Sequence, residues 1–154
     1  MAHNKIKELN SSLFRFTKIQ YIYLNNNQIN SILLEDFKNL IQLQELDLSY
    51  NIISTIEPNV FDNMPFLSSV NLKNNLLKSL DQNLFLKSNS LKNIDLSLNE
   101  LHVLPKNIFK GKEISFFDIR RNNLKGALMK GSFQGLTYIT ELDVSHQILA
   151  SIED

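Results

Sequence analysis

Cysteine is absent from this 154-residue chain, and glycine occurs only four times. Without cysteine there is no disulfide framework and no thiol nucleophile, and the redox compartment cannot be inferred from the sequence. The glycines form neither a phosphate-binding loop nor a dinucleotide fingerprint, and no G-x-S-x-G motif occurs. The sequence therefore lacks the commonest signatures of nucleotide-binding and hydrolytic enzymes.

Net charge and long apolar runs are also absent. Sixteen basic residues balance sixteen acidic ones, so no net field favours nucleic acid or an anionic membrane as the main partner. No apolar run approaches the roughly 18–20 residues that a membrane helix needs. The opening MAHNKIKELN has no apolar stretch of the kind found in signal peptides. We expect no nucleic-acid partner and no direct membrane insertion.

Metal-binding and catalytic groups are sparse. The three histidines, His3, His102 and His146, lie far apart in the sequence, which argues against a metal cluster. Asp143, Ser145 and His146 are close together, but a catalytic triad needs its histidine between the other two partners. Asp143 and Ser145 would instead project from one face of a short strand. The chain is therefore predicted not to be an enzyme, with no catalytic residue, no metal and no cofactor.

What the sequence does have is a repeat. An asparagine recurs every 24 residues and then once after 23, at Asn27, Asn51, Asn75, Asn99 and Asn122. The same apolar frame surrounds each of them, most clearly in Leu43-x-x-Leu46-x-Leu48-x-x-Asn51-x-Ile53-x-x-Ile56, followed by Phe61. A fixed period in the twenties is the signature of a solenoid.

The frame divides the whole chain into a single domain of successive repeats. We expect a partial repeat over 1–18, repeats over 19–42, 43–66, 67–90, 91–113 and 114–138, and a terminal repeat over 139–154. Each complete unit closes with a phenylalanine: Phe37, Phe61, Phe85, Phe109 and Phe133.

The frame resembles the leucine-rich repeat family, whose pattern is L-x-x-L-x-L-x-x-N-x-L. The repeat length and late phenylalanine are similar to its typical class, common in extracellular receptors and secreted matrix or immune proteins. The isoleucine-, asparagine- and lysine-rich composition is similar to insect Toll-like and chaoptin-like members. The resemblance implies an α/β-type solenoid, with a curved parallel sheet on the concave face and loops and short 3-10 turns on the convex face.

Elementary chemistry leads to the same arrangement. In Leu46-Asp47-Leu48-Ser49 the apolar residues alternate with polar ones, which is typical of a short strand with its leucines inward. Where the strand ends, an asparagine side chain can satisfy the backbone groups that the turn leaves unpaired. Stacked copies of Asn27, Asn51, Asn75, Asn99 and Asn122 should form a buried asparagine ladder.

Two outward-facing sets of residues are candidates for binding. Asp95, Asp118 and Asp143 should stack on neighbouring strands about 4.8 Å apart. They are either a cation site or surface for a basic partner, or simply the residue that this repeat favours. The second set is the predicted strip, which we expect to bind a partner on the concave face: Tyr50, Asn74, Leu98 and Arg121, with Phe116 and Arg120 alongside.

The strip is favoured because strand-borne side chains are rigid and in register, and because tyrosine and arginine are enriched at binding hot spots. Scattered exposed apolar residues are equally common without function. A competing site is the flank around Lys125 to Ser132, where a repeat carries its extra residue.

The ends of the chain lack recognisable caps, which solenoids need. We expect Ile6 and Leu9 at one end, and Leu149 and Ile152 at the other, to be partly exposed. Gln147 takes the asparagine position in the last repeat. These features favour a fragment of a longer protein with flanking capping domains; the alternative is a short protein that caps itself by pairing, for example as a homodimer.

The favoured function is a non-catalytic protein-binding module of an extracellular receptor or secreted immune or adhesion protein. The alternatives are a scaffold or dimerisation segment and an intracellular adaptor or regulatory subunit. The expected location is extracellular or at the cell surface, with the cytoplasm as the alternative. Asn10-Ser11-Ser12 is a glycosylation sequon that could be used only in a secreted chain.

Overall fold

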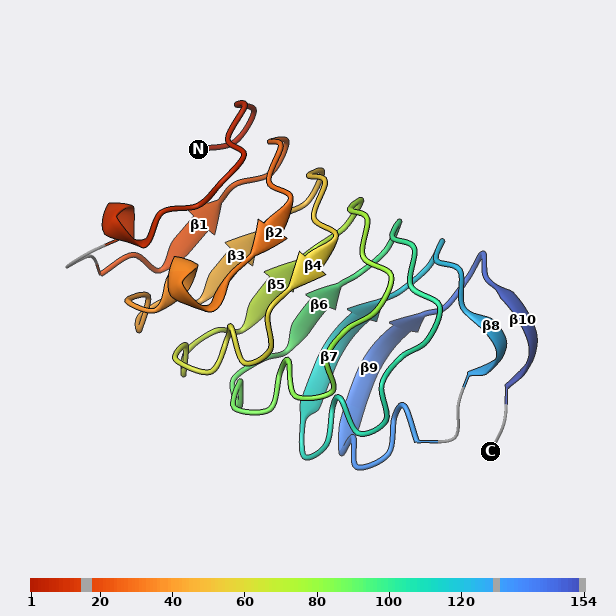
Figure 1. Cartoon of the computed structure of the whole chain (residues 1–154). Coiled ribbons are helices and arrows are strands. Elements are labelled where there is room, and N and C mark those ends of the chain that lie inside the picture. The colour runs from red at the N-terminus through yellow and green to blue at the C-terminus, as the bar shows by residue number, and fades with distance from the viewer. Residues whose placement is uncertain (15–17, 129–130, 153–154) are drawn as a thin grey trace.

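The main element of the computed structural model is a parallel sheet of six strands. The structure describes residues 1–14, 18–128 and 131–152. The sheet has the order β1-β3-β5-β6-β7-β9, so every strand pairs with the next copy along the chain (Figure 1). Its strands are β1 (Tyr21–Tyr23), β3 (Glu45–Asp47), β5 (Ser69–Asn71), β6 (Asn93–Asp95), β7 (Glu113–Asp118) and β9 (Tyr138–Asp143). The predicted solenoid is confirmed.

The sheet register follows directly from the repeat lengths. Tyr21 pairs with Glu45, Glu45 with Ser69 and Ser69 with Asn93, each one full period later. The shorter repeat brings Phe116 opposite Asn93, and the longer one brings Glu141 opposite Phe116. The length changes are absorbed outside the sheet, because slipping a strand by one residue would turn its apolar side chains outward.

The opposite side of the coil is mostly turns, with two short sheets and two 3-10 helices. Strand β2 (Ser31–Ile32) pairs with β4 (Thr55–Ile56), and β8 (Lys125–Leu128) pairs with β10 (Ile148–Ile152). The helices are η1 (Ser11–Phe14) and η2 (Leu34–Phe37). Besides the predicted loops and 3-10 turns, this side carries two short parallel pairs, because extended backbone after the asparagine can also pair with its parallel neighbour. No helix in the described ranges is long and apolar enough to span a bilayer.

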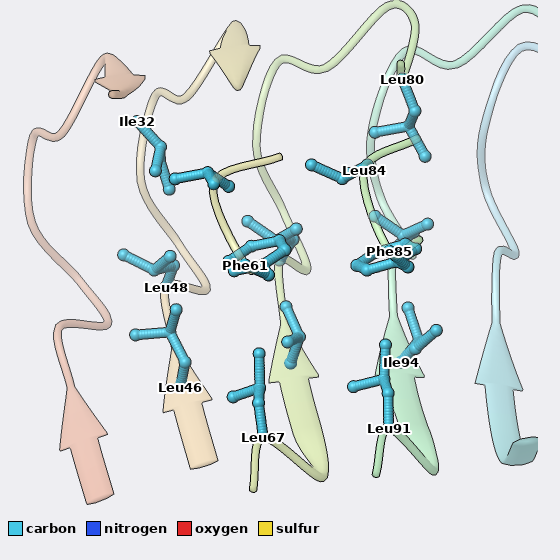
Figure 2. Packing of buried hydrophobic residues seen from close by; sticks show 14 of the residues in the cluster. Ile32, Leu46, Leu48, Phe61, Leu67, Leu80, Leu84, Phe85, Leu91 and Ile94 are labelled. Carbon is cyan, nitrogen blue, oxygen red and sulfur yellow. The ribbon is translucent and has the colours of Figure 1, made fainter. Parts of the chain in front are cut away.

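The core fills the space between the main sheet and the opposite side. Figure 2 shows Leu46, Phe61 and Ile32 at successive levels from the strands to the far side of the coil, and all three are fully buried. The phenylalanines stack from copy to copy. Phe61 and Phe85 have ring centroids 5.8 Å apart, and Phe85 and Phe109 are 6.3 Å apart. Each copy therefore buries its apolar face against the next one.

The asparagine side chains join successive copies by hydrogen bonds. Asn51 Oδ1 accepts from Ile29 N at 3.0 Å, and its Nδ2 donates to Leu24 O at 3.0 Å, both in the preceding copy. Within its own copy Nδ2 donates to Leu48 O at 3.0 Å and Ser49 O at 3.2 Å. The equivalent bonds form at three further positions, Asn75, Asn99 and Asn122.

The two ends of the ladder differ from its middle. Asn27 bonds Ile6 N at 3.1 Å and Met1 O at 3.1 Å, so the first residues occupy the place of a preceding copy. Ile6 and Leu9 are half-buried against the core. At the other end Gln147 donates to Ile119 O at 2.6 Å and accepts from Leu124 N at 3.3 Å. Gln147 thus makes the inter-copy bonds of an asparagine, while the side chains of 149 and 152 lie outside the described set.

One core column contains a lysine. The third residue after each closing phenylalanine is apolar in most copies, but Lys112 occupies this position and is only 4% exposed. Its Nζ donates to Leu86 O at 3.1 Å and to Asn89 Oδ1 at 3.3 Å. Burial lowers the pKa of Lys112, and the charge of Asp62 partly offsets this effect. The small Ser88, fully buried in the same column, leaves space for the long side chain.

Replacing Asn51 by alanine should lower the free energy of unfolding by about 1–3 kcal/mol, because buried backbone groups would lose their partners. Asn75→Ala should have a similar effect. Asn59 is a poor control because its φ of 61° disfavours alanine. The exposed Asn63 is a better one, and Asn63→Ala should change stability little. Urea unfolding measures all three, and equal losses at Asn51 and Asn63 would contradict the importance of the ladder.

Replacing Lys112 by methionine should raise the free energy of unfolding by about 1 kcal/mol at neutral pH, because a buried charge is removed. Since the pKa is lowered in the folded state, the charged lysine costs stability at neutral pH. That cost disappears as the pH rises through the lowered pKa toward the value of an unfolded lysine. The gain should therefore shrink at alkaline pH, whereas the exposed Lys110→Met should show no such trend. A pH-independent gain would contradict the assignment.

Candidate binding surface on the concave face and its rim

The concave face carries two columns of outward side chains from the six-stranded sheet. They come from equivalent positions paired in register on neighbouring strands. The first column is Tyr21, Glu45, Ser69, Asn93, Phe116 and Glu141, and the second is Tyr23, Asp47, Asn71, Asp95, Asp118 and Asp143. The surface is preorganised because each residue sits on a hydrogen-bonded strand.

Most residues of the second column also terminate their strands. Asp47 Oδ1 accepts from Ser49 N at 2.9 Å, and Asn71 Oδ1 accepts from Lys73 N at 3.0 Å. Three further copies make the same bond, from Ser97 N to Asp95, Arg120 N to Asp118 and Ser145 N to Asp143. Each is a local turn in which a side-chain oxygen replaces a ladder partner.

This geometry favours the structural interpretation of the aspartates over the cation site. Asn71 makes the bond as well as the carboxylates do, so the position requires an oxygen acceptor and no charge. Within the described ranges, no group of three or more histidine, cysteine, aspartate or glutamate residues could hold a metal ion.

Arg120 compensates the negative charge at the crowded end of the column. Its Nε lies 3.0 Å from Asp118 Oδ2, and its Nη1 lies 3.5 Å from Asp143 Oδ2. Burial raises the pKa of Asp118, and the nearby charges of Asp95 and Asp143 add to the rise, while the hydrogen bond from Arg120 N and the arginine charge oppose it. Hydrogen bonds from Ser145 lower the pKa of Asp143, with Arg120 contributing. Arg120 is therefore largely engaged within the chain.

Five residues of the predicted strip lie off the strands: Arg120 just after β7, and four others. Tyr50, Asn74, Leu98 and Arg121 have φ values of 53–56°, the left-handed region, and each directly precedes a ladder asparagine. The expectation that they are strand-borne was wrong, because the chain must turn sharply between the strand end and the buried asparagine. Only Phe116, on β7, belongs to the sheet itself. We call the line of residues before the asparagines the rim: Asn26, Tyr50, Asn74, Leu98, Arg121 and His146.

Several exposed side chains near this surface lie outside the predicted strip. Tyr21 and Tyr23 on β1 are 53% and 46% exposed, and Tyr21 Oη lies 3.4 Å from Gln44 Oε1. Beyond the rim, Ile52 and Leu76 are 48% and 42% exposed at successive copies of one position. Both residues directly follow a ladder asparagine, at a position that is not part of the buried apolar frame. Their exposure could therefore have been predicted from the sequence.

The competing flank around Lys125 to Ser132 is only partly described. Residues 129 and 130 lie outside the described ranges. Ser132 is buried, and its hydroxyl donates to Leu104 O at 3.3 Å. Gly131 O accepts from Asn107 N at 2.9 Å, which joins this flank to the preceding copy.

Comparison with known families agrees with this geometry. The model of BspA-type leucine-rich repeat regions matches residues 7–140 with six copies. The chain belongs to the BspA-type leucine-rich repeat family. The predicted resemblance is confirmed. No curated protein sequence matches the chain significantly.

Solved leucine-rich repeat structures resemble this chain over most of its length. The leucine-rich repeat domain of APL1B has a TM-score of 0.81 and 27% identity, over 97% of this chain and 43% of the other. TLR13, in a complex with ssRNA13, has a TM-score of 0.68 and 24% identity, over 92% and 23%. The ectodomain of the plant membrane receptor kinase GASSHO1/SCHENGEN3 from Arabidopsis thaliana, bound to CASPARIAN STRIP INTEGRITY FACTOR 2, has 0.76 and 27%, over 95% and 17%.

These matches define the class of this leucine-rich repeat chain. It spans less than half the length of each of these solved relatives. Its fold is typical of protein-binding modules in receptors, and the family and these neighbours are generally non-catalytic interaction modules. Repeat solenoids present extended surfaces, so function depends on the side chains that this particular chain displays.

Replacing Arg120 by glutamine should lower the free energy of unfolding by about 1–3 kcal/mol at neutral pH, because Asp118 and Asp143 lose their countercharge. The ionised form of Asp118 is already disfavoured, as its raised pKa indicates. Protonation of Asp118 removes the cost of burying its charge as the pH falls through that pKa. The loss of stability in Arg120→Gln should therefore become smaller in acid. Chemical unfolding at neutral and acidic pH measures the difference.

The double variant provides the control. Asp118→Asn keeps an oxygen acceptor for Arg120 N, as Asn71 does in its own copy. The combination Asp118→Asn with Arg120→Gln should therefore lose less stability than Arg120→Gln alone. Additive losses in this cycle would show that the arginine acts by packing rather than by charge.

Proposed function

We propose that this chain is a non-catalytic module that binds a protein partner through its concave face and rim, as part of an extracellular or cell-surface receptor or a secreted protein. The observation that carries the proposal is the register of the six strands, which aligns outward side chains from successive copies. Exposed aromatic residues lie among them, at Tyr21 and Tyr23, with the half-buried Phe116 farther along the sheet. Aromatic anchors on a rigid surface are typical of binding hot spots.

The charge of the concave face supports a protein partner with a basic surface. Its two columns carry six carboxylates, at Glu45, Asp47, Asp95, Asp118, Glu141 and Asp143. The cations beside them are fewer, and Arg120 is already paired with two of these aspartates. An acidic surface attracts basic partners and repels the phosphates of nucleic acid. TLR13 is nevertheless a relative solved with RNA, so an RNA ligand belongs among the outcomes to be tested.

The extracellular setting is supported by two observations. One similar structure is the ectodomain of a plant membrane receptor kinase. In this chain Asn10 is exposed, and its Oδ1 accepts from Ser12 N at 2.9 Å in a local turn. An exposed sequon in a turn is accessible to glycosylation in a secreted chain.

A second candidate function is self-association. Leu142 occupies the inward apolar position of β9 but is 43% exposed, whereas its equivalents Leu46, Ile94 and Phe117 are fully buried. An exposed edge of a solenoid core can be covered by another chain. The dimerisation segment is the second candidate because a second copy, like a following repeat of the same chain, would cover this edge.

Photo-crosslinking can test the concave site before any partner is known. A benzoylphenylalanine would replace Tyr23 or Phe116, with the 51% exposed Phe66, which precedes β5, as the matched control. Each variant would be mixed with secreted and surface proteins of the source organism. We expect the same protein to be captured from Tyr23 and Phe116 but not from Phe66. Tyr23→Ala should then weaken its binding by about 2 kcal/mol, as expected for an anchor.

The other outcomes are distinguishable. Capture from Phe66 alone would move the site to the loops between strands. Capture of RNA from the concave positions would contradict a protein ligand. Cross-links between two copies of the chain would favour self-association over the receptor proposal.

A further inference from the structure

The rim contains a hollow that is separate from the aromatic residues of β1. It has a volume of about 250 Å³, and its walls come from the described residues Lys73, Leu98, Arg120, Arg121, Ser145 and His146. Two arginines, a lysine and a histidine therefore surround one small space, and no carboxylate is among these lining residues. Three of these residues occupy the same position in successive copies. Leu98 and Arg121 directly precede ladder asparagines, and His146 precedes Gln147.

The backbone around the rim hollow is held in a fixed arrangement. Leu98 N donates to Arg120 O at 3.0 Å, and Arg121 N donates to Ser145 O at 3.1 Å. Leu98, Arg121 and His146 all have φ values between 53° and 56°, so the same turn presents each of them. Side chains from three successive copies thus converge because the turns repeat, and little ordering is needed when a ligand binds.

The rim hollow has uncompensated positive charge. Arg120 is paired with Asp118 and Asp143. By contrast, no ion pair is formed by Arg121 or Lys73 within the part of the chain that the structure describes. Ser145 also lines the hollow, with its hydroxyl engaged by Asp143. The guanidinium of Arg121 can offer two parallel N–H donors to one oxyanion.

We propose that the rim hollow binds a single phosphate or sulfate monoester group, with the carbon part of the ligand against Leu98. Several cations around one small space match a group with three terminal oxygens, either a phosphate monoester dianion or a sulfate monoester monoanion, better than a carboxylate with only two oxygens. The half-buried Leu98 provides an apolar wall beside the charged groups. The site goes beyond the protein-binding proposal and does not depend on it.

The surrounding charge argues against a polyanion. Asp95, Asp118 and Asp143 lie in the neighbouring column of the concave face, and Glu141 lies on the same strand as Asp143. A continuous chain of phosphates or sulfates leaving the rim hollow would approach these carboxylates and be repelled. The preferred ligand therefore carries one such group and little other negative charge.

Titration with small aromatic anions tests the site directly. Phenyl phosphate, phenyl sulfate and benzoate would be titrated into the intact chain at one ionic strength, with amide NMR shifts as the readout. We expect saturable binding of phenyl phosphate and phenyl sulfate, about tenfold tighter than benzoate, with shifts centred on Leu98, Arg121 and His146. The difference between the two esters identifies which source of the group the site prefers. Weaker binding of both esters than of benzoate would overturn the proposal.

Arg121→Gln should weaken binding of the preferred ester at least about tenfold, because a charge-assisted contact is lost. Arg121→Lys should restore part of it, since charge returns without the fork. The matched control is Lys110→Gln, which removes the same charge from a different hollow of about 200 Å³ lined by Lys106 and Lys110. Thermal unfolding and the unperturbed NMR spectrum would verify that each variant is folded.

Three further results would overturn the proposal: no saturable binding, an equal loss in Arg121→Gln and Lys110→Gln, or tight binding of heparin with only weak binding of phenyl phosphate and phenyl sulfate. Failure here leaves the concave-face proposal intact, because capture of a protein from Tyr23 does not involve Arg121. Conversely, ester binding could persist with no capture from Tyr23 or Phe116.

Discussion

The hydrogen bonds from one buried asparagine amide to two successive copies of the backbone are the constraint on which the remaining structure depends. Asn51 serves Leu24 and Ile29 in the preceding copy and Leu48 and Ser49 in its own. These backbone groups lie where the strand ends and cannot be satisfied by a sheet ladder. Because the amide forms hydrogen bonds to backbone groups of both copies, it fixes the position and direction of the next strand.

Two features of the surface are consequences of this turn. The residue before each asparagine must adopt the left-handed conformation, which lifts its side chain onto the rim. The aspartate or asparagine that ends the strand must accept a hydrogen bond from the N–H two residues later. An acidic concave column and a separate rim therefore lie side by side. Where both are crowded with charge, Arg120 links Asp118 to Asp143.

The candidate surface was only partly predictable for physical reasons. The inward positions are dictated by burial, so Leu46 and Phe61 could be assigned from the period alone. Outward positions face weaker constraints, and the pattern could not show whether Tyr50 sits on a strand or in a turn. Nor could it reveal that Arg120 is engaged by aspartates of its own and the next copy, or that Lys112 is buried at its position in the column.

The sequence by itself determined the solenoid, the parallel sheet and the register of its six strands, because a repeated apolar frame can bury its face only against the next copy. Its tertiary structure decided which side chains converge. Lys73, Arg121 and His146 are far apart in the chain, and they meet at one hollow only because the turns stack in register. Gln147 is a second example. Its side chain is one methylene longer than that of asparagine, and it still reaches Ile119 O because the local spacing of the two copies allows it.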